Sequence, residues 1–258
     1  MTVGSSFGQS LGADQYGCKN ITLYDINPFS LFYGYLLITA ILCLDYVEFQ
    51  NFFFRHGLKS YYNKEMFKKE TFNKIKPTLR LLDYDSYLFW DELFTLFDGK
   101  TIRENLFDED EDRNTVIKSF NIYLRNETTY NKLKSIVRNM AFRFINGNLF
   151  KDSIEGKFDN IFLSNLYKVS TMDEFKSLLD KLSNHNLEKK GSILLAYLWQ
   201  IDFNEIGFQD DWLEMYKMLQ TKEKLKEYIT EYHQIKGAHD FLWERDDKED
   251  LVLIYRKK

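Results

Sequence analysis

With 258 residues, 44% of them hydrophobic and 29% charged, the chain has the composition of a folded protein and enough length for one large domain, residues 1–258. This composition excludes an intrinsically disordered polymer. The formal net charge of −4 gives no general attraction to nucleic acid or to an anionic membrane surface, so we expect neither as a partner.

The cysteines and histidines give no sign of a metal or a disulfide framework. Cys18 and Cys43 match no metal or redox spacing, and the four histidines form no ligand motif. We therefore expect no metal site. Such cysteine usage fits a reducing compartment, and the N-terminus shows no basic region followed by an apolar run. A cytoplasmic location without a signal peptide is the expectation.

The first 28 residues predict a short strand, a glycine-bearing turn, a short helix and a second strand that ends on an acid. Residues 21–24 (ITLY) have the β-branched and aromatic composition of a strand, and Asp25 closes it. Asn27-Pro28 then stops the strand and favours a helix start. Gly4 lies 21 positions before Asp25. That spacing is close to the one between the turn glycine and the ribose-binding acid of a nucleotide-binding β-α-β unit.

The turn itself indicates which nucleotide is favoured. A dinucleotide-binding turn has the pattern G-x-G-x-x-G, but Ser6 stands where the second glycine belongs, and no P-loop lysine follows Gly8. A ligand that has a ribose but no phosphate to be cradled is favoured, and S-adenosylmethionine is the obvious candidate. We expect Gly4, Ser5, Ser6 and Gly8 to approach it. A structural strand-turn-helix without a ligand is the alternative.

Residues 29–44 are apolar nearly all round. A membrane span needs about 20 such residues, and this run has 16 before Asp45. We predict a helix buried against the sheet, with membrane contact as the alternative, and no transmembrane segment. Residues 46–54 predict a second helix with an aromatic cluster.

Residues 59–138 predict a large helical insertion. Leu88, Trp90 and Phe94 belong to an apolar pattern with three-to-four spacing, and residues 116–124 and 130–137 repeat the helical pattern. The acidic run 107–112 lacks the alternating ligands and the glycine of a calcium loop, so we interpret it as a solvated helix start. We expect the insertion to form a wall or lid over the acceptor side of the site.

Strands and helices then alternate to the end of the chain. The predicted strands are residues 141–146, 158–163 and 192–198, the predicted helices are residues 172–183, capped by Thr171 or Ser170, and 211–228, and a hairpin pairs residues 240–244 with 251–255. Alternation of this kind predicts a mostly parallel, doubly wound sheet. The expected fold class is therefore α/β and Rossmann-like, with a C-terminal antiparallel hairpin.

Small polar residues follow four of the predicted strands. In open α/β sheets, ligands bind outside the carboxyl ends of the strands. The alternative for each residue alone is an ordinary turn, where glycine, asparagine, serine and aspartate are common. The candidate positions are Gly4, Ser5, Ser6 and Gly8 after the first strand, Asp25 and Asn27 after the second, Asn148 and Leu149 after the third, and Ser164 and Asn165 after the fourth.

The segments TVGSS, ITLYDINP, FDNIFLSN and KKGSILLAYL together resemble the class I S-adenosylmethionine-dependent methyltransferases. Within these, the chain is most similar to the branch that includes the betaine-lipid-type 3-amino-3-carboxypropyltransferases, which have a Ser-Gly-Asp turn and a D-[IL]-N-P acid motif. The likeness covers most of the chain in scattered blocks. Phe7-Gly8-Gln9 stands where the Gly-Asp pair is expected.

The resemblance implies roles for the strand-end residues. Asp25 would bind the ribose, and Asn148-Leu149 would contact the adenine, at a position where family members usually have an acid. Asn165 would hold either the amino acid part of the cofactor or the acceptor, and Tyr167 would close the pocket, with a helix cap and a packed ring as the alternative for this pair.

The implied function is transfer of a methyl group to a small molecule, a lipid head group or a polysaccharide precursor. Two alternatives stay open. One is transfer of a 3-amino-3-carboxypropyl group. The other is a non-catalytic methyltransferase-like binding protein, which the irregular glycine turn favours.

Overall fold

The computed structural model describes residues 1–4, 7–54, 65–106, 121–195, 228–235 and 250–257. The chain divides into two compact units. Unit 1 comprises Met1–Ser6, Tyr24–Ile26 and Gly147–Lys258, and unit 2 comprises Phe7–Leu23 and Asn27–Asn146.

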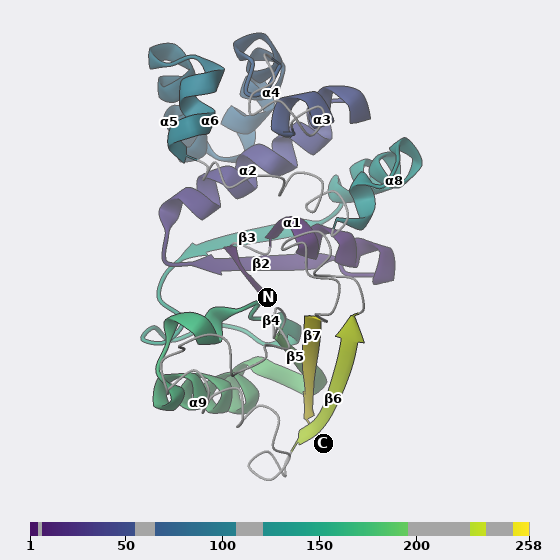
Figure 1. Ribbon diagram of the computed structural model, residues 1–258, viewed down its shortest axis with the longest axis vertical. Helices are drawn as coiled ribbons and strands as arrows, with labels where there is room; N and C mark the ends of the chain where they lie inside the picture. The colour runs from purple at the N-terminus through teal and green to yellow at the C-terminus, as the bar shows by residue number, and fades with distance from the viewer. Residues whose placement is uncertain (5–6, 55–64, 107–120, 196–227, 236–249, 258) are drawn as a thin grey trace, which may run out of the picture. The chain divides into compact units, whose positions relative to one another are not determined.

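Among the described residues, seven strands form a sheet in the order β3-β2-β1-β4-β5-β7-β6. The strands are Thr2–Val3 (β1), Asn20–Asp25 (β2), Ala141–Asn146 (β3), Phe158–Phe162 (β4), Leu187–Leu195 (β5), Tyr228–Ile235 (β6) and Asp250–Lys257 (β7). Strand β4 pairs in parallel with β1 and β5, whereas β7 runs antiparallel to β5 and β6 (Figure 1). The fold is therefore α/β, with a mostly parallel sheet and a C-terminal antiparallel pair, as predicted. The order reverses between β1 and β4, as in dinucleotide-binding folds.

The C-terminal hairpin has a different first strand from the predicted one. Strand β7 contains the predicted residues 251–255, but it pairs with β6, so that Tyr228 lies opposite Lys257 and Ile235 opposite Asp250. The sequence pattern had assigned Tyr228 to the end of a helix. The rest of that helix, residues 211–227, and the predicted strand 240–244 lie outside the described residues.

Strand β5 begins five residues earlier than predicted because it contains a bulge. Phe158 of β4 is level with Leu187, whereas Asn160 is level with Ser192. Lys190 within the bulge has a φ of 71°. A Cβ atom at Gly191 would lie 2.9 Å from the backbone oxygen of Asp159, so the close approach of the two strands requires glycine there.

The described helical segments of unit 1 follow β4. Thr171 caps α9 by accepting a hydrogen bond from the backbone N–H of Glu174 (3.3 Å), which confirms one of the two predicted caps. The segments are η4 (Leu166–Val169), α9 (Met172–Lys181) and a π-helical turn, η5 (Leu182–Asn186).

Unit 2 contains the predicted helical insertion together with the helices around it. The acidic run 107–112 and residues 116–120 of the predicted helix 116–124 lie outside the described residues, and residues 122–124 form η3. The elements are α1 (Phe7–Ser10), η2 (Leu11–Tyr16), α2 (Pro28–Cys43), α3 (Tyr46–Phe53), α4 (Lys69–Leu82), α5 (Tyr84–Leu96), α6 (Gly99–Leu106), η3 (Ile122–Leu124) and α8 (Glu127–Val137).

Helix α2 is the centre of unit 2 and lies between β3 and the helices α3 to α6 (Figure 1). It begins as the sequence predicts, because Pro28 is its first residue and the Asn27 side chain accepts a hydrogen bond from Phe29 N (3.0 Å). A Cβ atom at Gly34 would lie 2.7 Å from Phe144 Cε1, so glycine lets α2 approach β3 closely. No helix in the described part of the chain has both the length and the apolar character to cross a membrane.

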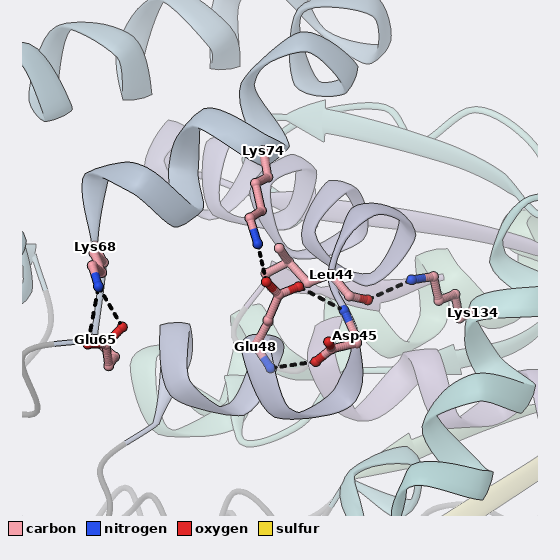
Figure 2. A network of polar contacts seen from close by, with 7 residues as sticks. All are labelled: Leu44, Asp45, Glu48, Glu65, Lys68, Lys74 and Lys134. Carbon is pink, nitrogen blue, oxygen red and sulfur yellow. Dashed lines mark hydrogen bonds and ion pairs between the residues drawn. The ribbon is translucent and has the colours of Figure 1, made fainter.

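A polar network fixes the junction between α2 and α3 (Figure 2). The Leu44 carbonyl, at the end of α2, accepts hydrogen bonds from Lys134 Nζ (2.6 Å) and Tyr130 OH (3.2 Å) of α8. Asp45 and Glu48 form a capping box at the start of α3, and Lys74 of α4 forms an ion pair with Glu48. These contacts join helices that are far apart in sequence.

The aromatic face of α5 is mostly core. Trp90 is fully buried and donates its indole N–H to the Phe32 carbonyl (2.9 Å), and Phe94 stacks on Phe72 with 4.1 Å between ring centroids. Phe97 remains exposed. The insertion as a wall over the acceptor stays a prediction.

Candidate functional site

Unit 1 brings the end of β2 together with the loop that follows β3. Asp25, the last residue of β2, is half-buried, and its backbone carbonyl accepts a hydrogen bond from Gly147 N (2.9 Å). Gly4 follows β1, and Ser5 and Ser6 lie outside the described residues. The predicted ribose-binding acid and the predicted adenine-binding loop are therefore neighbours in unit 1.

Hydrogen bonds within the chain hold the loop after β3 in one conformation. The Asn148 side-chain oxygen accepts from Phe150 N (2.9 Å), and the Asn148 backbone N–H donates to Asp152 Oδ2 (2.6 Å). Tyr24 OH donates to the same Asp152 oxygen at 3.4 Å. The Asn148 oxygen thus already has a structural partner, and Asp152 is a residue that the sequence reasoning missed. An aspartate four positions after an asparagine in a polar turn was its one local signal.

Tyr24 stays a hydrogen-bond donor in this arrangement. Burial raises the pKa of its hydroxyl, and both the negative charge of Asp152 and the hydrogen bond to it raise that pKa further. A Cβ atom at Gly147 would lie 2.6 Å from Tyr24 Oη and 2.7 Å from Asp152 Oδ2. Glycine is therefore required where these two side chains meet over the loop.

Lys181, at the end of α9, also holds the loop after β3 in place. Its ammonium group donates to the backbone carbonyls of Leu149 and of Asp152, the latter at 2.9 Å. Burial lowers the pKa of Lys181, and the charge of Asp152 opposes that change. The Leu149 side chain, predicted to contact adenine, is 5% exposed.

The end of β4 carries a strained residue next to an exposed amide. Ser164 is buried and has a φ of 52°, in the left-handed region that non-glycine residues rarely occupy. Asn165 is exposed at the start of η4 and makes no capping hydrogen bond there. Tyr167 is 2% exposed, and its ring packs edge-on against Phe175 of α9. The ring is therefore a core side chain, and a role for Tyr167 at the acceptor stays a prediction.

Gly8 and Asn27 belong to unit 2 and not to this group. The predicted turn ends before Phe7, because residues 7–10 form α1 and the Phe7 ring packs against Phe144 (5.3 Å between centroids). Gly8 is thus a helical residue, and a Cβ atom there would be in ordinary contact with Tyr123. Asn27 serves as the cap of α2.

No group of three or more histidine, cysteine, aspartate or glutamate side chains that could hold a metal ion occurs in the described part of the chain. Among the described residues of unit 1, the carboxylates of Asp25 and Asp152 and the amide of Asn165 are accessible near the strand ends.

Comparison with solved structures finds methyltransferases. No protein-family model matches the sequence, and no curated protein matches it significantly. The chain is similar to the N-methyltransferase NodS from Bradyrhizobium japonicum WM9 in complex with S-adenosyl-l-homocysteine, with 14% identity and a TM-score of 0.30 over 50% of this chain and 62% of NodS. A TehB-like methyltransferase from Corynebacterium glutamicum aligns with 18% identity and a TM-score of 0.29 over 52% of this chain and 65% of its own.

TehB from Haemophilus influenzae aligns with 16% identity and a TM-score of 0.27, over 57% of this chain and 54% of its own. The chain therefore spans less than two thirds of the length of these three methyltransferases. Likenesses at these TM-scores establish neither the family nor the activity of the chain. A function therefore has to be argued from the residues of unit 1.

Proposed function

We propose that the chain is an S-adenosylmethionine-dependent transferase whose cofactor binds at the strand ends of unit 1, and that it methylates a small molecule, a lipid head group or a polysaccharide precursor. The hydrogen bond from Gly147 N to the Asp25 carbonyl (2.9 Å) carries this proposal. It joins the acid at the end of β2 to the loop after β3, at the edge of an open α/β sheet where ligands bind.

The residues of unit 1 fit such a ligand. Asp25 offers a half-buried carboxylate that can accept hydrogen bonds from both ribose hydroxyls, and Gly4 has no side chain to obstruct the approach. Asp152 adds an exposed carboxylate on the loop. The sequence lacks both the P-loop and the G-x-G-x-x-G pattern, so it does not select for a phosphate-bearing ligand.

The chain's own residues need to do little more than position the acceptor against the methyl group. S-Adenosylmethionine, when bound, provides a methyl group on a positively charged sulfur, which is already activated for nucleophilic attack. Asn165 presents an exposed amide that can hold the acceptor, and Tyr167 anchors the same turn, η4, through its buried ring. Holding the acceptor in line with the methyl carbon can contribute most of the rate.

Two alternatives remain as proposals. The same sulfur can donate its 3-amino-3-carboxypropyl group, which is the reaction of the branch that the sequence resembles. A non-catalytic binding protein is favoured by the irregular glycine turn, since Ser6 stands where the second glycine belongs and helix α1 begins at Phe7.

Isothermal titration calorimetry of the full chain with S-adenosylmethionine and with S-adenosylhomocysteine tests the proposal. We expect saturable binding of both at one site per chain. Binding without turnover in the presence of a cell extract would support the non-catalytic alternative. No heat of binding with either nucleoside would contradict the cofactor site itself.

A further inference from the structure

We infer that the hairpin of helices α4 and α5 in unit 2 is the surface through which two copies of this chain associate. In the described part of the chain, nine large apolar side chains are exposed, and six of them lie between residues 81 and 97. They include Leu81, 87% exposed at the end of α4, and Leu96, 63% exposed at the end of α5. Single exposed apolar side chains are normal, but a concentration of them on adjoining elements marks an interaction surface.

The exposed side chains of α5 form a ridge along one face of the helix. Residues four positions apart lie next to each other on a helix, and such ridges pack into the grooves of other helices. On the opposite face, Trp90 donates its indole N–H to the Phe32 carbonyl of α2 (2.9 Å). The ridge therefore points away from α2. Its members are the exposed residues Tyr84, Leu88, Glu92 and Leu96.

Helices α4 and α5 are antiparallel neighbours of opposite charge. Phe72, near the start of α4, stacks on Phe94 near the end of α5, with 4.1 Å between ring centroids. At the other end of the hairpin, the Arg80 guanidinium lies 6.0 Å from the centroid of the Tyr84 ring. Helix α4 contains four basic residues and one acid, whereas α5 contains three acids and no basic residue. The hairpin is therefore basic along one helix and acidic along the other.

Two exposed charges of the hairpin have no ion-pair partner within the part of the chain that the structure describes. They are Arg80 of α4 and Asp85, in the first turn of α5. Arg80 lies over the rings of Tyr84 and Tyr87, the latter at 5.6 Å, so it is level with the turn of α5 that carries Asp85. Each charge can therefore pair with its opposite on another molecule at the same height along the helices.

One two-fold arrangement satisfies both charges. A two-fold contact places the same surface of each copy against the other. When the axis runs parallel to the helices and between them, α4 of one copy lies on α5 of the second, and every residue keeps its height along the axis. Arg80 is then level with Asp85 of the second copy, and this contact occurs twice. An axis across the helices would place α5 against α5, and acid against acid. The charge pattern of the hairpin is thus self-complementary, so a second copy is the partner that it fits.

The test is sedimentation equilibrium of the full chain, for which we expect a reversible dimer. Arg80→Asp and Asp85→Arg each place like charges at both contacts, so each should raise the dissociation constant about tenfold or more. In an equimolar mixture of the two variants, a heterodimer again pairs opposite charges at both contacts, so dimerisation should return. Glu127→Arg reverses an exposed acid in the first turn of α8 and is the matched control, which should dimerise like the parent.

Three results would overturn the inference, and none of them depends on the proposed function. A wild-type chain that stays monomeric at all concentrations would leave the surface to a different protein. A dimer that neither charge reversal weakens would use another surface. A mixture that stays monomeric, although circular dichroism shows both variants folded, would exclude the pairing of Arg80 with Asp85.

Discussion

The backbone N–H of Gly147 donates a hydrogen bond to the backbone carbonyl of Asp25, with 2.9 Å between nitrogen and oxygen. This bond joins the end of β2 to the loop after β3 without using either side chain. The Asp25 carboxylate can therefore be removed while the backbone contact remains, so the effect of a substitution on ligand binding can be separated from its effect on folding.

Asp25→Ala should weaken binding of S-adenosylmethionine by about 10- to 150-fold, because a hydrogen bond to a charged group contributes about 1.5–3 kcal/mol. Calorimetric titration of the variant measures the loss, and urea unfolding should show little change in stability. Asp173→Ala, which removes a carboxylate that is 97% exposed at the start of α9, is the control. If Asp25→Ala binds as tightly as the parent, Asp25 is only the residue that ends the strand.

Gly147→Ala should destabilise the protein by about 1–3 kcal/mol, the usual cost of forcing an extra methyl group into a packed site. The new Cβ atom would lie 2.6 Å from Tyr24 Oη and 2.7 Å from Asp152 Oδ2, so the Tyr24–Asp152 contact has to open. Urea unfolding measures the change. Gly12→Ala is the control, because its nearest neighbours would be 4.0 Å away. Equal stabilities of the two variants would contradict the packing described for the loop.

Elements with strong local signals were predictable from the sequence. Strand β3 has the predicted bounds, residues 141–146, because its apolar residues are flanked by turn residues. Helix α2 begins at the predicted Asn27-Pro28 pair, and Thr171 caps α9. In each case, the residues that determine the boundary lie within a few positions of it.

Features that depend on distant contacts were not predictable in the same way. The role of Asp152 depends on Tyr24, which lies 128 positions earlier. The burial of Tyr167 depends on Phe175 of α9, and the start of β5 depends on a bulge opposite β4. A polar turn, a buried aromatic ring and a strand bulge have no local sequence pattern of their own. The residues around them would fit other structures equally well, so their roles become visible only in the folded chain.

The stability of the protein should fall as the pH rises from about 10 toward 12. Burial raises the pKa of Tyr33 to about 12, and the charge of Arg103 opposes this rise. In this interval tyrosines of the unfolded chain ionise while Tyr33 stays protonated, so the folded state binds more protons and raising the pH favours unfolding. A difference of about two pKa units corresponds to about 2–3 kcal/mol.

Urea unfolding of the parent and of Tyr33→Phe at several pH values checks this dependence. The variant should lose less stability than the parent between pH 10 and 12, because it lacks the phenol that must stay neutral. Tyr84→Phe, which changes a ring that is 54% exposed, should follow the parent. Parallel curves for the parent and Tyr33→Phe would show that Tyr33 does not cause the loss.

The by-product should identify the group that is transferred, and we expect S-adenosylhomocysteine. Methyl and 3-amino-3-carboxypropyl groups both leave when a nucleophile attacks a carbon next to the sulfur, so one site can serve either reaction. The sequence has Phe7-Gly8-Gln9 where the aminocarboxypropyl branch has its Gly-Asp pair, and these residues belong to helix α1. That pair lies where the aminocarboxypropyl arm would be held for attack, so its absence favours methyl transfer.

Incubation with S-adenosylmethionine and a cell extract, followed by mass spectrometry, resolves the two nucleosides, S-adenosylhomocysteine and methylthioadenosine. Methylthioadenosine above the level of a protein-free control would reverse this preference.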